Sequence, residues 1–377
     1  MEQLAAEIEY KNTLADVLTF YDLRSLPHAT IKDIAIALGE DTNGSTKNRL
    51  VEVIWKEIKD NRDLRNEILR EYVGELYTNK VTLSYYKAGS FKGLKNKIIE
   101  REGRKVIDGN LLINEEAINT IPKLHSIAED SGEFFKENCF IAKYLYQDGY
   151  YNIPTAEGNQ QIKKIRTLTA YIDEENGILE VRAPKDIAKK VASSLAGYYE
   201  DNREVYNLSI LGNHEGNSEN LAKTLDGYLL ESSGEPTLAL NEVTDEQVLA
   251  IKSILNSIDS GLSESTDEID YEKIIYEAKE ILFSEQDPVP FLALILAGLD
   301  KVSLKTFVDS LLSNPLYSSL SPYLTNKGGY IRFEAQYKNI TNPYTIQVAT
   351  TSNTIYFPGN TNEVAIEKLR KAVYGLK

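Results

Sequence analysis

The 377-residue sequence is poor in the residues that build redox and metal sites, with one cysteine, one methionine and three histidines. The single cysteine, Cys139, cannot form an intramolecular disulfide, and a cysteine-rich zinc site is excluded. No run of eighteen apolar residues occurs, so we expect no transmembrane helix and no membrane association. The first residues, MEQLAAEIEYKN, lack the pattern of a signal or transit peptide, which favours a soluble cytoplasmic protein.

Positive charge is also scarce, because the net charge is −15, but its distribution is uneven. Residues 1–110 contain 18 basic and 18 acidic residues, whereas the rest contains 24 basic and 39 acidic residues. The segment from Lys80 to Lys105 holds eight basic and two acidic residues, interleaved with Tyr85, Tyr86 and Phe91. Basic residues beside aromatic ones are typical of a phosphate-binding surface, and the alternative is a solvated helix face.

Residues 29–59 predict two short helices joined by a tight polar turn. Thr30 has the properties of an N-cap, and Gly39 those of a helix end. Ser45 or Thr46 is predicted to cap the second helix, whose apolar stripe is Leu50, Val51 and Ile54. Lys47 and Arg49 then fall in its first turn, where the helix dipole disfavours cations. This local conflict favours an external anion near the two side chains.

The same residues resemble a SAP domain, the small helix–extended loop–helix module that binds DNA. Ile31-Lys32 and Leu38-Gly39 match the first helix of that family, and Gly44-Ser45-Thr46-Lys47 matches the second block with one extra residue before the lysine. Leu50-Val51 and Ile54 complete the pattern, whereas Glu40 replaces the leucine that the family places after the glycine. The resemblance implies contact with duplex DNA, either non-specific or AT-preferring, and the alternative is a hairpin used only for packing.

We therefore predict that duplex DNA is contacted by the hairpin and by the basic run that follows it. The predicted contact residues are Gly44, Thr46, Lys47, Arg49, Lys92, Lys95, Lys97, Arg101, Arg104 and Lys105. These side chains are expected to converge on one surface and to bind phosphates without reading the base sequence.

The predicted fold class is α+β, with three segments. Residues 1–110 are predicted to be helical, residues 111–235 to form an α+β domain, and residues 236–377 to form an acidic helical block, a C-terminal β-meander and a helix. Residues 168–183 predict a β-hairpin around Asn176-Gly177, followed by a helix that Pro184 opens. Strands at 330–337, 344–350 and 354–357 and a helix at 362–374 repeat this order, so the two units are predicted to share a sheet.

Residues 225–290 contain sixteen acidic residues and three lysines. Helices are predicted at 243–258 and near 269–284, 289–299 and 302–313. The side chains of the first helix predicted to face inward are Val248, Ile251, Ile254, Leu255 and Ile258. An acidic helical block repels nucleic acid, so we expect this part to bind a protein partner or to self-associate.

Two short motifs suggest hydrolytic chemistry. Gly212-Asn213-His214-Glu215 resembles the metal-binding block of calcineurin-like phosphoesterases, but the further histidines and aspartates of that family are absent. Asp173 with Glu180-Val181-Arg182 approaches a PD-(D/E)xK nuclease motif, but arginine replaces the lysine and cannot transfer a proton. No Gly-rich phosphate loop is present, and we expect no cofactor and no metal.

The sequence therefore predicts a non-enzymatic, DNA-associated protein of bacterial or phage type, with an acidic part that binds proteins. One alternative is an interaction subunit of a larger assembly, such as a bacterial or phage defence complex, without DNA contact. The other alternative is a metal-dependent nuclease or phosphoesterase.

Overall fold

The computed structural model describes most of the chain in thirteen stretches of unequal length. They are residues 12–107, 115–129, 134–135, 138–155, 158–199, 204–237, 244–262, 276–278, 281–282, 295–296, 299, 301–306 and 310–376. The chain forms two compact units, one of residues 1–213 with 333–377 and the other of residues 214–332. The boundaries predicted at residues 110 and 235 do not coincide with this division.

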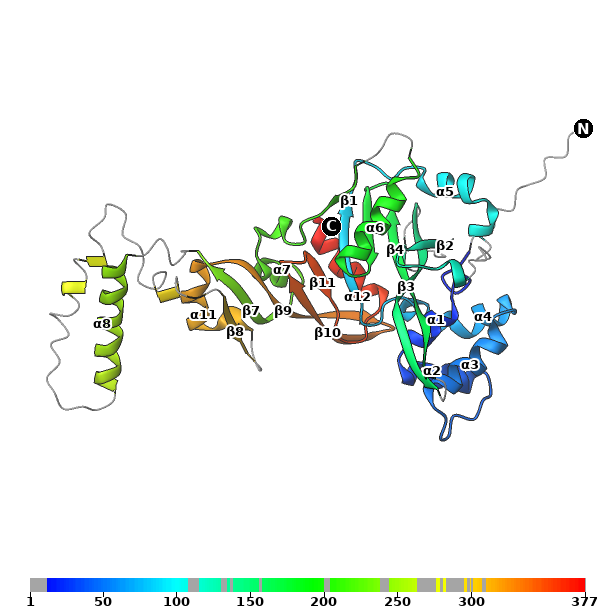
Figure 1. Cartoon of the computed structure of the whole chain (residues 1–377), viewed down its shortest axis with the longest axis horizontal. Helices are drawn as coiled ribbons and strands as arrows, with labels where there is room; N and C mark the ends of the chain where they lie inside the picture. The colour runs from blue at the N-terminus through cyan, green and yellow to red at the C-terminus, as the bar shows by residue number, and fades with distance from the viewer. Residues whose placement is uncertain are drawn as a thin grey trace, which may run out of the picture. The chain divides into compact units, whose positions relative to one another are not determined.

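The first unit begins with a helical region built from short helices (Figure 1). Its elements are α1 (Phe20–Ser25), α2 (His28–Ala37), α3 (Lys47–Ile58), α4 (Arg62–Leu69) and the 3-10 helix η1 (Arg70–Glu75). Buried aliphatic side chains such as Leu23, Ile34, Leu50 and Ile54 form its core. The apolar stripe predicted for the second helix of the hairpin therefore faces inward.

A large antiparallel sheet occupies the rest of the first unit. Its strands are β1 (Thr82–Lys87), β2 (Lys123–Ala128), β3 (Cys139–Thr155), β4 (Gly158–Asp173), β5 (Ile178–Arg182), β6 (Tyr206–Asn207), β10 (Ile340–Ala349) and β11 (Thr354–Tyr356). The order in this unit is β2-β3-β4-β5-β1-β11-β10, and β6 pairs with β1. The mixed α+β class predicted from the sequence is confirmed.

Strand β1 corrects the prediction that residues 1–110 are helical throughout. It lies at the centre of the sheet and pairs with β5 on one side and with β11 on the other. Leu83, Tyr85 and Tyr86 on this strand are buried. The two β-hairpins thus lie in one sheet with β1 between them, because β1 supplies hydrogen-bond partners to both.

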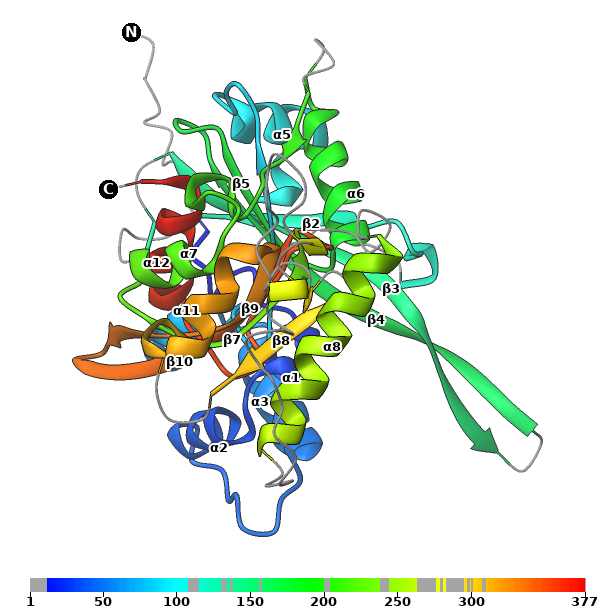
Figure 2. The same cartoon turned by 90° about the vertical axis from the view of Figure 1, so that its left-hand side faces the viewer.

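The remaining helices of the first unit flank the sheet (Figures 1 and 2). They are α5 (Leu94–Glu102), η2 (Arg104–Val106), η3 (Glu115–Ala117), α6 (Lys185–Ala196) and α12 (Glu363–Tyr374). Pro184 precedes α6 as the sequence predicts, and the Asn362 side chain accepts a hydrogen bond from the backbone of Ala365 at the start of α12. Apolar side chains of α5 and α6, including Ile98 and Val191, form one core with Phe140 and Tyr144 of β3.

The second unit contains short helices and three antiparallel strands. Its elements are α7 (Ser218–Thr224), β7 (Tyr228–Pro236), α8 (Asp245–Leu262), β8 (Val302–Lys305), η6 (Leu311–Ser313), α11 (Pro315–Leu320), η7 (Ser321–Tyr323) and the first part of β9 (Leu324–Tyr337), and the short η4 (Gly212–His214) spans the unit boundary. Strand β7 pairs with both β8 and β9. Glu219, Tyr317, Ser321 and Lys327 form a polar cluster, with Lys327 Nζ 2.8 Å from Glu219 Oε1.

Two helix predictions in the acidic segment need correction. Residues 302–305 form strand β8 and pair with β7, whereas the sequence pattern predicts a helix. Of the five side chains of α8 predicted to face inward, Val248, Leu255 and Ile258 are each more than 40% exposed, whereas Ile251 is buried and Ile254 partly buried. Most residues of the helices predicted near 269–284 and 289–299 lie outside the described residues. Across the described residues, no helix is both long enough and apolar enough to cross a bilayer.

Candidate nucleic-acid interface

In the helical hairpin of α2 and α3, the start of α3 has the local geometry that the sequence predicts. Thr46 is the N-cap of α3, and its hydroxyl accepts a hydrogen bond from the backbone N–H of Arg49 at 3.4 Å. Gly44 has a φ of 65° and Gly39 a φ of 82°, conformations that favour glycine. Thr30 is not the N-cap of α2, because that helix already begins at His28 and its N-cap residue is Pro27.

Lys47 at the start of α3 lies near two further cations, Arg24 and Lys80. Burial lowers the pKa of Lys47, and the positive charges of Arg24 and Lys80 lower it further. Arg24 is in the last turn of α1 and Lys80 follows η1, and both side chains are exposed. The Asn79 side-chain amide donates to the carbonyl of Ser25 at 2.7 Å, which fixes the backbone beside Lys80 next to the end of α1. We name these three cations the Lys47 cluster.

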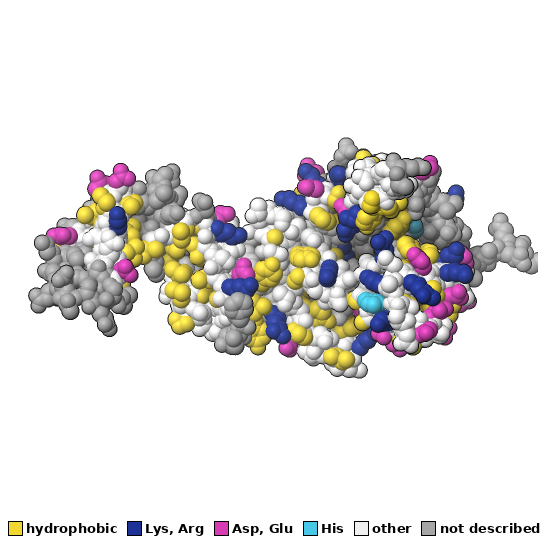
Figure 3. All heavy atoms as spheres, turned by 60° about the horizontal axis from the view of Figure 1, so that its bottom comes forward, with side chains coloured by type: hydrophobic (Ala, Val, Ile, Leu, Met, Phe, Trp, Pro, Cys, Tyr) yellow, Lys and Arg dark blue, Asp and Glu magenta, His cyan; other side chains and the backbone are white. Residues whose placement is uncertain are grey.

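The setting of the Lys47 cluster suits an anion. Like charges close together repel, and the positive end of the α3 dipole adds to that repulsion. An anion bound there would relieve both effects. Exposed Arg49 lies in the same first turn of α3. Figure 3 shows Lys and Arg side chains spread over the helical part of this face, with Asp and Glu gathered toward its right-hand edge.

The cations of α5 differ from the Lys47 cluster, because several of them already interact with other residues of the chain. Lys95 forms an ion pair with Glu129, and Lys97 Nζ lies 5.6 Å from the centre of the Tyr199 ring. The Arg101 guanidinium donates to the carbonyl of Gly197 at 3.0 Å. Glu174 already supplies an anion at the start of α5, where its carboxylate accepts from the backbone N–H of Lys95 at 2.7 Å.

The two groups of predicted contact residues do not share a surface. Helix α5 lies at the top and α3 at the bottom of the first unit in both Figure 1 and Figure 2. Lys92 and Lys105 are exposed at the α5 end, and the Arg104 side chain lies outside what the structure describes. The expected convergence of all these cations is therefore wrong, because the sheet separates the two ends. Gly44, Thr46, Lys47 and Arg49 do lie together.

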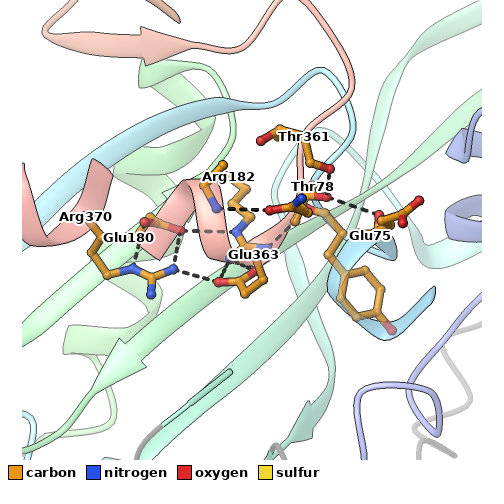
Figure 4. A network of polar contacts seen from close by, with 10 residues as sticks. Glu75, Thr78, Glu180, Arg182, Thr361, Glu363 and Arg370 are labelled. Atoms are coloured by element: carbon orange, nitrogen blue, oxygen red, sulfur yellow. Dashed lines mark hydrogen bonds and ion pairs between the residues drawn. The ribbon is translucent and has the colours of Figure 1, made fainter. Parts of the chain in front are cut away.

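A buried network of four charged side chains lies between β5 and α12 (Figure 4). Arg182 Nη2 lies 2.7 Å from both carboxylate oxygens of Glu363, and Arg370 Nε lies 2.9 Å from Glu180 Oε2. Arg370 also donates to Glu363 at 2.9 Å, and Arg182 to Glu180 at 3.2 Å. Burial raises the pKa of Glu363, but the two guanidinium groups outweigh burial and lower it. Two positive and two negative charges thus compensate one another.

This network accounts for the residues that resemble a nuclease motif. Glu180 has no exposed surface, and both of its carboxylate oxygens accept from arginine. Asp173 is also buried, and it accepts from Asn176 in the turn between β4 and β5. Glu180 thus belongs to a closed structural ion network, and Asp173 stabilises a turn.

The residues that resemble a phosphoesterase block also have structural contacts. The Asn213 side chain donates to the carbonyl of Val373 near the end of α12 at 2.8 Å. His214 is buried, with its Nδ1 3.5 Å from the Thr224 hydroxyl. Among the described residues, no group of three or more His, Cys, Asp or Glu side chains is arranged to hold a metal ion.

Sequence reasoning missed several charged residues that shape this part of the molecule. Arg24 and Lys80 were not predicted to meet Lys47, because they are distant from it in sequence. Lys143 lies within the otherwise apolar run CFIAKYLY, a signal that could have predicted a buried partner. That partner is Asp22 of α1.

Comparison with known proteins adds no assignment. No family model, no curated protein and no solved structure matches this chain. The candidate site therefore rests on the geometry and charges of its own residues.

Proposed function

We propose that this protein is a non-enzymatic, DNA-associated protein whose N-terminal helical region contacts the phosphates of duplex DNA. The observation that carries the proposal is the Lys47 cluster. Lys47 begins α3, which shares a core with α1, and the Asn79–Ser25 hydrogen bond holds Lys80 beside the end of α1 that carries Arg24. Thr46 is the N-cap of α3, so the first-turn backbone N–H groups of this helix belong to the residues around Lys47. Phosphate is the anion that such a combination of cations and helix N-terminus binds well.

The proposed contact is with the phosphates and not with base edges. Lys47 is partly buried, and the exposed Arg49 lies in the same first turn of α3, so both cations face the same solvent-accessible helix end. Backbone contacts of this kind position a protein on a duplex but carry no sequence information. The acidic remainder of the chain repels DNA, so the phosphate contacts are expected at this surface.

Retention of a short labelled duplex by the full-length chain at low and moderate salt tests the proposal. Binding is expected at low salt and should fall steeply as salt rises, because bound phosphates release counterions. The double variant Lys47→Glu/Arg49→Glu should abolish it. Absence of binding by the wild type at low salt, or equal binding by the double variant, would contradict the proposal.

The second candidate function is protein interaction through α8, without DNA contact. Val248, Leu255 and Ile258 lie on one face of this helix and are 42%, 43% and 49% exposed. Exposed apolar side chains at spacings of seven and three residues are typical of a helix that packs against a partner. Self-association of the chain, or its capture of a basic protein with DNA absent, would favour this candidate.

A further inference from the structure

Strands β3 and β4 continue beyond the sheet as a two-stranded ribbon (Figure 2). We name residues 149–155 and 158–165 the ribbon arm. Its cross-strand pairs run from Tyr150 with Lys163 to Thr155 with Gly158. The neighbouring strands stop short of it, since β2 pairs with β3 only as far as Leu145 and β5 pairs with β4 only from Ala170.

The two faces of the ribbon arm differ in chemistry. Tyr151 lies directly opposite Ile162, and Ile153 lies opposite Gln160 on the same face. Tyr151, Ile153 and Ile162 are 44%, 42% and 43% exposed, so an apolar face is in water. The other face is mixed, because Asn152 and Gln161 lie on it between the pairs of Tyr150 with Lys163 and of Pro154 with Asn159. Contiguous exposed apolar side chains on a projecting element indicate a binding surface.

The charged residues at the base of the ribbon arm are three basic ones and one acidic one, and this net positive charge favours an anionic partner. From Gly149 to Ile162 the sequence has a single charged residue, Glu157, which lies outside the described part of the chain. This composition is unusual in a chain of net charge −15. The basic residues Lys163, Lys164 and Arg166 follow at the base, where Asp148 forms ion pairs with the last two.

The base of the ribbon arm and the Lys47 cluster are held by the same short helix. The Thr167 hydroxyl donates to Asp22 of α1 at 2.7 Å, directly after the arm in sequence. Arg24 of the Lys47 cluster is two residues further along α1. The arm therefore starts beside the surface proposed to contact phosphates.

We propose that the ribbon arm enters the minor groove of duplex DNA, with Tyr151, Ile153 and Ile162 against the sugars and bases. This inference rests on the proposed function, since the Lys47 cluster would hold the phosphates while the arm reaches the adjacent groove. Proteins that bind the minor groove often place apolar side chains against the base steps and amides toward the base edges. Gln160, opposite Ile153, supplies such an amide, and it would favour A·T over G·C pairs only weakly.

The test measures binding of the full-length chain to a short fluorescein-labelled duplex by anisotropy. Ile153→Ser/Ile162→Ser should weaken binding by about tenfold or more, because two buried apolar contacts are lost. Its salt dependence should stay that of the wild type, because no cation is removed. The matched control, Asn152→Ser/Gln161→Ser, changes the other face at the same level of the ribbon and should bind like the wild type. Distamycin, which fills the minor groove, should weaken the wild type but not the Ile153→Ser/Ile162→Ser variant.

The outcomes separate this inference from the proposed function. If the wild type binds no duplex at low salt, both fail. If the wild type binds and the Ile153→Ser/Ile162→Ser variant binds equally well, only the ribbon arm inference fails. Sedimentation without DNA tests whether the apolar face instead binds a second copy of the chain. A dimer in the wild type and a monomer in the Ile153→Ser/Ile162→Ser variant would show this and would overturn the inference. Far-ultraviolet circular dichroism would show that each variant is folded.

Discussion

The ammonium group of Lys143 on β3 forms an ion pair with the carboxylate of Asp22 on α1 and joins the helical region to the sheet. Lys143 has no exposed surface, and its Nζ lies 4.0 Å from the centre of the Tyr77 ring. Asp22 also accepts from the hydroxyls of Thr19 and Thr167, both at 2.7 Å. Burial lowers the pKa of Lys143, and the Asp22 carboxylate opposes that effect. The pair therefore fixes α1, and with it Arg24, against β3 and β4.

Lys143→Met should lower the free energy of unfolding by about 3–5 kcal/mol, because it leaves the Asp22 carboxylate buried without its cation. The double variant Lys143→Met/Asp22→Asn should recover part of this loss, since both charges are then removed. Urea denaturation measures both effects. Lys32→Met on the exposed face of α2 is the matched control and should change little. Equal stability of Lys143→Met and the wild type would contradict the role of the pair.

His125 on β2 should make stability depend on pH in mildly acidic solution. Burial and the Lys143 ammonium lower the pKa of His125 from 6.5 to about 4 in the folded state. Below pH 6.5 the unfolded chain binds a proton that the folded chain does not, so stability falls as the pH drops toward about 4. The full loss is about 3 kcal/mol at most.

His125→Gln should flatten this part of the pH profile, as measured by urea denaturation at several pH values. His28→Gln removes an exposed histidine of α2 and should leave the profile unchanged. A His125→Gln profile with the wild-type slope between pH 6.5 and about 4 would contradict the assignment to His125.

Glu180→Gln tests whether the Arg–Glu network is structural. Loss of one carboxylate leaves two buried arginines with a single negative charge between them. This should lower the free energy of unfolding by about 3–5 kcal/mol. Thermal unfolding measures the effect, and Glu334→Gln, at an exposed position of β9, is the control. We expect no cleavage of DNA by the wild type with magnesium, manganese or zinc. Metal-dependent cleavage that Glu180→Gln abolishes without loss of stability would restore the nuclease alternative.

Salt dependence should distinguish the two groups of cations. Lys47→Gln/Arg49→Gln should reduce the slope of log affinity against log salt by about 1.8, because each lost phosphate contact contributes about 0.9. Lys92→Gln/Lys105→Gln removes two exposed cations at the α5 end and should leave the slope unchanged. Equal reductions in both variants would show that DNA also contacts the α5 end.

The apolar face of α8 gives a prediction for protein interaction. Leu255→Ser/Ile258→Ser should weaken self-association measured by sedimentation, if α8 packs against a second copy of the chain. Leu249→Ser removes an apolar side chain that is 65% exposed on another face of the same helix, so it should have a smaller effect. A sedimentation profile that is monomeric in the wild type would exclude the self-association form of this candidate.

The sequence by itself determined elements whose signals are local. Asn176-Gly177 specifies the turn between β4 and β5, Pro184 precedes α6, and Thr46 caps α3, because a turn or cap depends on residues within a few positions. The hairpin of α2 and α3 was predictable for the same reason.

Only the tertiary structure decided which charges meet. The basic run from Lys80 to Lys105 reads as one patch in sequence, but β1 carries the chain through the centre of the sheet and places Lys80 and α5 at opposite ends. Lys80 then joins Arg24 and Lys47, whereas Lys95 pairs with Glu129. Pairing between strands distant in sequence fixed these positions, and a linear pattern of charge carries no information about that pairing.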